Sequence, residues 1–295
     1  MRYIVAKFLY CFLWFKVRKE IRRTDSVLAI YGHDQRKMPF EELVKWLLKY
    51  DFHFITPQEL YSFVKGCKLE NEKNIWLSFD DGWRSNYTEI LPVLLKYNIP
   101  ATIFVATKGV EDGYYWFDRA FQNRESKLYS IVDELWSMPD YDRKQIIEKL
   151  PLYKGERETM NPEELKKMSD SKLVSWGNHT HDHVMSDNCT EDELCAEIDK
   201  CQRMMYQYVG DKCDFIYSYP NGNYDDRSYQ IVKNFGFKMA VTTELGRVFI
   251  GSDPFRIKRN EIKNVCLEEN ILQVFGLWTP FFNSIKRLFG IKDRK

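Results

Sequence analysis

Short apolar runs of strand length alternate along the chain with amphipathic helical patterns. Between the first two runs, residues 40–50 place Leu43, Val44, Leu47 and Leu48 on one helical stripe. This alternation predicts a parallel sheet with helices packed outside it, and therefore an α/β protein. The runs are Val27–Gly32, Ile75–Phe79, Ala101–Ala106 and the stretches LVSWGN, DFIYSYPNG and FKMAVTT.

The pattern changes in three places, which divides the chain into parts. Residues 111–160 mix aromatic and charged side chains with few strand signals, so we expect a mostly helical insertion there. We interpret residues 26–262 as the α/β body that carries this insertion. Residues 1–25 form a basic, aromatic N-terminal segment, and residues 263–295 form an amphipathic, basic C-terminal segment.

Both ends of the chain carry an excess of basic side chains. The net charge is only +1, which gives no general electrostatic reason to bind nucleic acid. Residues 1–23, however, carry seven basic side chains against one acidic, and residues 286–295 carry five against one. Both ends are also rich in aromatic and aliphatic residues, as in segments that lie in a membrane interface. We expect peripheral membrane contact through both termini, with a C-terminal helix docked on the body as the alternative for residues 263–295.

Two features bear on location. Lys7 interrupts the first apolar run, and the eight residues from Phe8 to Phe15 are far short of the roughly 20 that span a bilayer. Seven cysteines without a CxxC pair suggest neither a disulfide framework nor a thiolate zinc site. We therefore expect a cytoplasmic protein at the inner membrane surface, with an uncleaved anchor as the alternative.

Histidine is scarce, but three of the five histidines fall in the segment GNHTHDH as His179, His181 and His183. Two imidazoles from one segment and a remote carboxylate can hold a zinc-like ion while leaving positions open for water and substrate. Spacing does not decide which two bind. His179 and His181 share one face of a strand, whereas His179 and His183 share one face of a helical turn.

Asp80 and Asp81 follow the apolar strand Ile75–Phe79 directly. One carboxylate of such a pair can ligate a metal while the other takes a proton; the simpler reading is a turn before Gly82. Together with the histidines, and at strand ends where parallel sheets gather reactive groups, they favour metal-assisted hydrolysis.

Several motifs in a fixed order extend this interpretation. The stretches SFDDGW, LPVLLKYNIPATIFVAT, VSWGNHTHDH, YSYPNGNYDD and GFKMAVTT resemble the NodB-homology polysaccharide deacetylases, carbohydrate esterase family 4. The resemblance covers roughly residues 27–262. It implies a distorted (β/α) barrel and hydrolysis of N-acyl groups on sugars.

Residue roles follow from the resemblance by position. It implies Asp80 as general base, and Asp81, His179 and His183 as ligands of a divalent metal. Zinc is the expected ion, with cobalt, nickel or another divalent ion as alternatives. The backbone N–H of Asn221, after the proline of YPNG, would donate to the oxyanion.

Two positions depart from the family pattern. Ser218 stands where an arginine commonly orients the base, and no histidine follows His183 to act as late general acid. The exopolysaccharide deacetylase branch draws its acid from a histidine after the first strand, so we assign that role to His33 in YGHD. For orienting the base we propose Arg259, and we consider Asp118 and Arg119 as groove residues.

These features predict a metal-dependent carbohydrate N-deacetylase, a hydrolase acting on a non-peptide C–N bond. Its substrate would be an N-acylated amino sugar in a surface polysaccharide, or a lipid- or nucleotide-linked precursor. The alternatives are a catalytically impaired carbohydrate-binding protein on the same fold and a deformylase of a formamido sugar.

Overall fold

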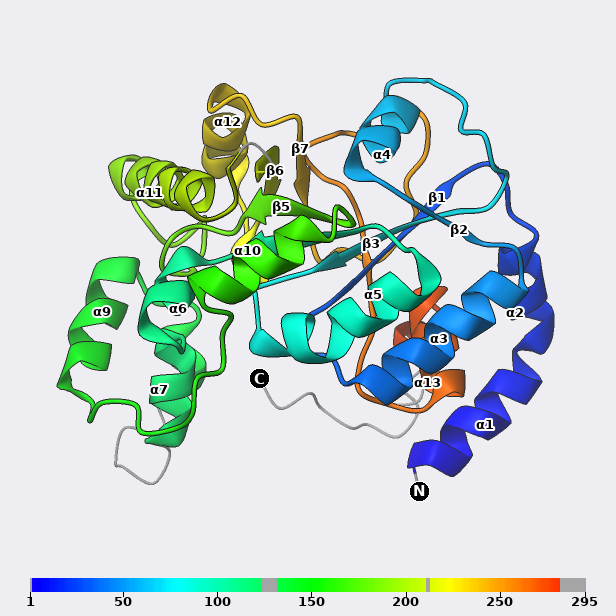
Figure 1. Ribbon diagram of the computed structural model, residues 1–295, viewed down its shortest axis with the longest axis horizontal. Coiled ribbons are helices and arrows are strands. Elements are labelled where there is room, and N and C mark those ends of the chain that lie inside the picture. The colour runs from blue at the N-terminus through cyan, green and yellow to red at the C-terminus, as the bar shows by residue number, and fades with distance from the viewer. Residues whose placement is uncertain (1, 124–131, 211–212, 282–295) are drawn as a thin grey trace.

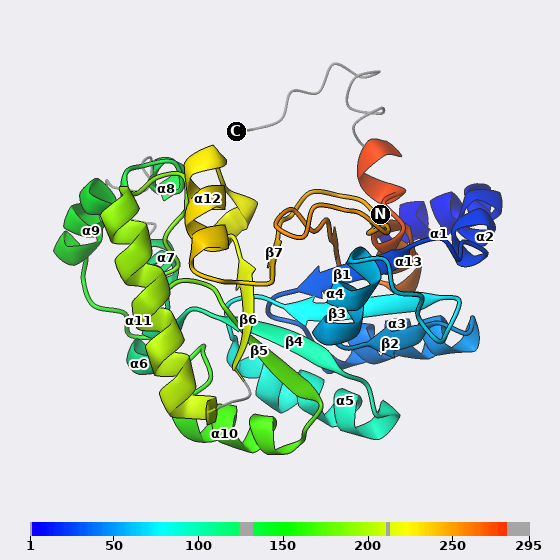
Figure 2. The ribbon, with the colours of Figure 1, turned by 90° about the horizontal axis from the view of Figure 1, so that it is seen from above.

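The fold is built around a parallel sheet that curls into a partial barrel (Figures 1 and 2). The computed structural model describes residues 2–123, 132–210 and 213–281. Within these residues the sheet has eight strands, in the order β7-β6-β5-β4-β3-β1-β8, with β2 also paired to β3. The strands are β1 (Val27–Gly32), β2 (His53–Ile55), β3 (Asn74–Phe79), β4 (Ala101–Val105), β5 (Val174–Asn178), β6 (Cys213–Ser218), β7 (Met239–Val241) and β8 (Asn260–Glu261).

Helices occupy most of the connections between strands, which confirms the predicted α/β class. Those before and between the first strands are α1 (Arg2–Phe12), α2 (Trp14–Ile21), α3 (Lys37–Lys49), α4 (Pro57–Val64) and α5 (Leu91–Tyr97). Between β4 and β5 lie α6 (Thr107–Asp112), α7 (Trp116–Gln122), α8 (Val132–Leu135), α9 (Asp140–Lys149) and α10 (Pro162–Asp170). The last are α11 (Glu191–Val209), α12 (Asp226–Asn234) and α13 (Leu267–Val274).

Each central strand is buried on both faces, which explains why the strand runs are apolar throughout rather than alternating. In β1, Val27 and Ala29 belong to the inner cluster, which includes Trp76 and Phe104. The intervening Leu28 belongs to the outer cluster beneath the helices. The period of two along a strand thus divides the core into an inner and an outer layer.

The end of the barrel where β1 begins is closed by local contacts. Val27 pairs with Val248 there in an antiparallel bridge, whereas the parallel bridge between Val241 and Ile257 lies at the carboxyl end of β7. Helix α4 contributes Leu60 and Phe63 to the inner cluster at this end. Loops with polar residues lie at the opposite end of the barrel, where the parallel strands finish.

Helix starts follow the capping signals in the sequence. Thr56 and Asn161 each accept a backbone hydrogen bond from the residue three positions on, and the Glu there bonds back to the cap. These are capping boxes followed by proline at the first helical position, where no N–H is needed. The pairs Thr56 with Glu59 and Asn161 with Glu164 thus mark the starts of α4 and α10.

Two helical regions lie at opposite ends of the molecule (Figures 1 and 2). The helices α6, α7 and α9, inserted between β4 and β5, form one end. At the other end α1 packs against α13, and Arg2 binds the buried carboxylate of Glu269 with an Nε–Oε2 distance of 2.9 Å. Helix α13 itself is docked on the body, with Ile271, Leu272 and Val274 buried. Residues 282–295, which the sequence interpretation assigns to the basic C-terminal segment, lie outside the described residues.

Two further observations concern the chain as a whole. Among the described residues, none of the helices combines the length and apolar character needed to cross a bilayer. All seven cysteines are free thiols, as their scattered spacing predicts.

Candidate metal centre and active site

The predicted functional residues meet at the carboxyl ends of the parallel strands. Asp80 and Asp81 follow β3, His179 follows β5, and Asn221 lies in the turn after β6. Together with His33, which follows β1, they line a cavity of about 430 Å³. Residues from four distant stretches of the chain thus share one site because parallel strands end at one edge of a sheet.

Three side chains in this cavity form a compact donor cluster. One ligand atom each from Asp81, His179 and His183 lies within 4.8 Å of the others, and all three residues are buried. The Nε2 atoms of His179 and His183 are 3.2 and 3.3 Å from Oδ1 of Asp81. His181 points elsewhere, with its Nδ1 2.9 Å from the hydroxyl of Thr107.

The surroundings of this cluster fit a divalent cation. Oδ2 of Asp81 accepts a hydrogen bond from Nε1 of Trp83 at 2.7 Å, but Oδ1 is a buried acceptor with no hydrogen bond among the described residues. Nδ1 of His179 lies 2.8 Å from the carbonyl oxygen of Ser218, an arrangement that leaves Nε2 to act as ligand. One carboxylate and two imidazoles are a donor set that suits zinc and similar ions.

The same cluster explains the ionisation of Asp81. Burial by itself raises the pKa of this carboxyl, but the imidazoles of His179 and His183 outweigh it and hold the pKa well below the ordinary value. Asp81 is therefore a carboxylate at neutral pH and available as a ligand.

Asp80 is held by a different partner. Burial also raises the pKa of Asp80, but Arg259 more than compensates and lowers the pKa below its ordinary value. Two guanidinium nitrogens of Arg259 bind the two carboxylate oxygens of Asp80, each at 2.7 Å. Arg259 is fully buried and also donates to the hydroxyls of Ser78 and Ser218. The arginine immediately precedes β8, while Ser218 occupies the position at which the family commonly has arginine.

His33 and Asn221 lie on the rim of the cavity. The His33 side chain is 39% exposed, and its Nδ1 is 3.9 Å from a carboxylate oxygen of Glu261. Asn221 has φ 58° and ψ 6°, a left-handed conformation that asparagine tolerates better than most residues. Positive φ also occurs at Asp81, Thr180 and His183. Four of the seven non-glycine residues with positive φ in the described part of the chain thus lie at or beside this site, while Asp51, Asn98 and Lys172 lie elsewhere.

Several residues of the site were not predicted. Glu261 lies in β8 two positions after Arg259, so the period of two was the available signal. Trp83 donates to Asp81, and Phe117 and Trp136 line the cavity from the insertion. No local pattern distinguishes these aromatic residues from core positions.

The two groove candidates are placed differently from expectation. The Asp118 carboxylate accepts a hydrogen bond from the N–H of Tyr115 at the start of α7. Arg119 bonds the carbonyl of Pro151 and lines a second cavity. Neither residue lines the cavity with the metal cluster, because α7 presents the aromatic Phe117 to that cavity.

Comparison with known proteins agrees with the fold. The family described as polysaccharide deacetylase matches residues 68–240. A poly-beta-1,6-N-acetyl-D-glucosamine N-deacetylase of Staphylococcus aureus is 26% identical over 268 residues, covering 90% of this chain and 78% of that protein. YxkH of Bacillus subtilis is 25% identical over 210 residues, 71% of this chain but only 59% of YxkH, so the chain spans less than two thirds of that relative.

Similarity also extends to solved structures. The deacetylase PplD of Streptococcus pyogenes superposes with a TM-score of 0.62 at 19% identity, covering 85% of this chain and 97% of PplD. This similarity shows a shared fold. The chain belongs to the polysaccharide deacetylase family, which confirms the resemblance and the predicted barrel.

The geometry predicts which histidines bind metal. Replacing His179 or His183 with Ala should weaken Zn²⁺ binding at least 100-fold, because each change removes one of three ligands. His181→Ala is the matched control, since its imidazole bonds Thr107 and should leave affinity within threefold. Isothermal titration calorimetry of the metal-free proteins measures this, and equal losses in all three variants would contradict the assignment.

Proposed function

We propose that this protein is a metal-dependent N-deacetylase that removes an acetyl group from an amino sugar in a surface polysaccharide or its lipid- or nucleotide-linked precursor. One observation carries the proposal: the Asp81, His179 and His183 cluster lines the same cavity as Asp80, whose carboxylate is held by Arg259. Membership in the polysaccharide deacetylase family and the name of the Staphylococcus aureus relative support a glycan substrate.

The donor set supports a metal as part of the site, with zinc as the proposed ion. A divalent ion held by Asp81, His179 and His183 would polarise an amide carbonyl and lower the pKa of a water molecule towards about 7. An amide carbonyl is a poor electrophile and water is a poor nucleophile, so this chemistry addresses both difficulties.

Asp80 supplies the proton acceptor. Its carboxylate accepts the proton of the attacking water as the water oxygen bonds to the carbonyl carbon. Arg259 acts as a positioning residue, because its bidentate contact fixes the orientation of the carboxylate and keeps it ionised. Ser218 and Ser78 in turn hold the guanidinium.

The tetrahedral oxyanion and the leaving amine require two further groups. The backbone N–H of Asn221 donates to the oxyanion. His33 donates a proton to the sugar nitrogen as the C–N bond breaks, and the products are acetate and a free amine. Glu261 lies beside this acid, with a carboxylate oxygen 3.9 Å from Nδ1 of His33.

The site favours catalysis over glycan binding alone. An impaired protein would lack both a residue that orients the base and a residue that protonates the leaving amine. Arg259 contacts Asp80 directly, and His33 lines the same cavity. Both departures are thus filled by residues from other parts of the chain, and a deformylase differs only in releasing formate rather than acetate.

We also propose peripheral membrane contact through the N-terminal segment, residues 1–25. Helices α1 and α2 bury Ala6, Leu9 and Val17 against the body. Their other face exposes large apolar side chains: Tyr3 (53%), Ile4 (70%), Phe8 (69%), Phe12 (63%) and Phe15 (66%). Ile4, Phe8 and Phe12 are four residues apart and therefore lie along one line on the helix surface.

Charge selects the partner for this face. Residues 1–23 carry seven Lys and Arg side chains and one Glu, so an anionic bilayer surface complements both the charge and the apolar stripe. Free thiols throughout fit a cytoplasmic location at the inner membrane surface. The docked α13 offers no comparable face, and the proposed contact of residues 282–295 lies outside the described residues.

Asp80→Asn tests the assignment of the base. We expect acetate release from N-acetylglucosamine oligosaccharides to fall by 10²–10⁴-fold, because an amide cannot accept the water proton. Zn²⁺ affinity should stay within a few-fold, since Asp81 and both imidazoles remain. Asp51→Asn, at an exposed carboxylate far from the cavity, is the matched control. Full activity of Asp80→Asn would refute the mechanism, and formate release from N-formyl sugars alone would identify a deformylase.

His33→Gln tests the assignment of the acid. Hydrolysis of the N-acetyl sugar should fall at least 100-fold, because an amine leaves only after protonation. Hydrolysis of 4-nitrophenyl acetate should change less than threefold, since the phenolate leaves without a proton. His53→Gln, an exposed histidine on β2, should change neither rate. Equal losses on amide and ester would show that His33 is not the acid.

Phe8→Ser combined with Phe12→Ser tests the membrane face. Co-sedimentation with vesicles of phosphatidylcholine and phosphatidylglycerol should fall at least tenfold, because the variant loses two large apolar side chains from the exposed helix face that we propose enters the membrane interface. Tyr206→Ser with Phe215→Ser, which removes exposed aromatics elsewhere, should have no effect. Unchanged vesicle binding, or conversion of a dimer to a monomer without any vesicle binding, would overturn this proposal.

A further inference from the structure

His183 is held in a different way from His179. The Nδ1 atom of His179 lies against the carbonyl of Ser218, whereas Nδ1 of His183 is buried without a hydrogen-bond partner among the described residues. His183 also has φ 48°, in the left-handed region. Metal-binding imidazoles are normally oriented by a hydrogen bond to their second nitrogen. Among the described residues, packing contacts rather than a hydrogen bond to Nδ1 therefore hold the ring of His183.

Aromatic rings from the insertion surround that imidazole. The ring centroid of Phe117 is 5.4 Å from that of His183, and the centroids of Tyr115 and Trp136 are each 6.2 Å away. Tyr115 also donates its hydroxyl hydrogen bond to the backbone carbonyl of Asp81. Two of the three proposed ligands thus contact residues inserted between β4 and β5.

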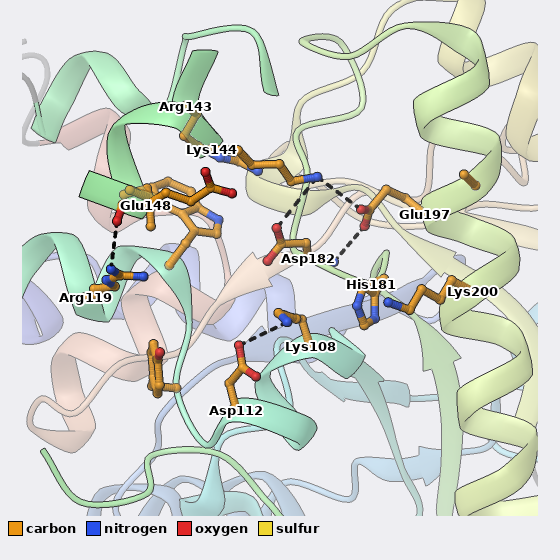
Figure 3. A pocket seen from close by; sticks show the side chains of 14 residues that line it. Lys108, Asp112, Arg119, Arg143, Lys144, Glu148, His181, Asp182, Glu197 and Lys200 are labelled. Atoms are coloured by element: carbon orange, nitrogen blue, oxygen red, sulfur yellow. Dashed lines mark hydrogen bonds and ion pairs between the residues drawn. The ribbon is translucent and has the colours of Figure 1, made fainter. Parts of the chain in front are cut away.

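A second set of contacts joins the insertion to the segment that carries His183, beside a cavity of about 480 Å³ (Figure 3). Lys144 of α9 lies between the carboxylates of Asp182 and Glu197, at 3.8 and 3.5 Å. The backbone N–H of Asp182 donates to Glu197 at 2.7 Å. Asp182 immediately precedes His183. The insertion therefore contacts the side chain of the residue next to the ligand as well as the imidazole ring of the ligand itself.

Both sets of contacts converge on Asp140 at the start of α9. Its buried carboxylate binds Lys144 at 2.7 Å and also pairs with Arg143. The guanidinium of Arg143 lies 4.4 Å over the ring of Trp116, which packs 4.8 Å from the ring of Trp136. One route therefore runs from Asp140 through Lys144 to Asp182, and the other runs through Arg143 and two tryptophans to His183.

We propose that the insertion is a working part of the metal centre: Trp136 and Lys144 position His183, and through it they set the affinity of the site for its metal. This inference depends on the ligand set of the proposed function but not on the substrate or the reaction. Outer-sphere residues that orient metal ligands typically change metal affinity by about 10–100-fold when removed.

Zinc affinity measured by competition with a fluorescent chelator tests the inference without any turnover. Trp136→Ala and Lys144→Met should each weaken Zn²⁺ binding about tenfold or more. Trp136→Phe keeps an aromatic ring beside His183 and should restore affinity to within threefold of the original. Lys149→Met, an exposed lysine on the same helix, is the matched control and should have no effect.

Near-ultraviolet circular dichroism of the metal-free variants separates positioning from unfolding. Trp136 and Lys144 are both partly exposed, and the conservative variants Trp136→Phe and Lys144→Arg retain the contacts if the larger changes unfold the protein. Affinities within twofold of the original in folded Trp136→Ala and Lys144→Met would overturn the inference. Normal Zn²⁺ affinity without deacetylation would count against the proposed function instead.

Discussion

Two adjacent carboxylates buried at the end of β3 impose the constraint on which the site depends. Asp80 and Asp81 are 2% and 4% exposed, and buried charges are costly unless each has a partner. The structure meets this demand in two ways. Arg259, just before β8, neutralises Asp80, whereas Asp81 faces two imidazoles with one oxygen left without a hydrogen bond among the described residues. Asp80 is therefore a fixed carboxylate suited to accept a proton, whereas Asp81 keeps one oxygen available as a metal ligand.

The same constraint explains why the site draws on so much of the chain. Partners for the carboxylates come from the loop after β5 and from the residue just before β8, and the sheet brings them to one edge. The inserted helices add a second layer around His183, where aromatic packing takes the place of the usual hydrogen bond. The inserted segment therefore contributes residues to the surroundings of the proposed metal site.

Much of the fold could be predicted from the sequence because its signals are local. Continuous apolar runs indicated buried parallel strands, and Thr56 with Glu59 indicated the start of α4. Asp81, His179 and His183 were proposed as ligands through a family resemblance, whereas spacing alone left His181 as an equal candidate. The loop conformation after β5, with positive φ at Thr180 and His183, directs His181 away and brings His183 back.

The sequence by itself determined the α/β class, the order of the elements and which residue types were available for chemistry, since these depend on periodicity and neighbouring residues. The family resemblance suggested Arg259 for the place beside Asp80, but only the tertiary structure decided that its guanidinium also bonds Ser78 and Ser218, that Glu261 lies near His33 and that the insertion contacts the proposed ligands. Those contacts join residues more than 30 positions apart, and no pattern within a short stretch encodes which distant side chain fills a given space.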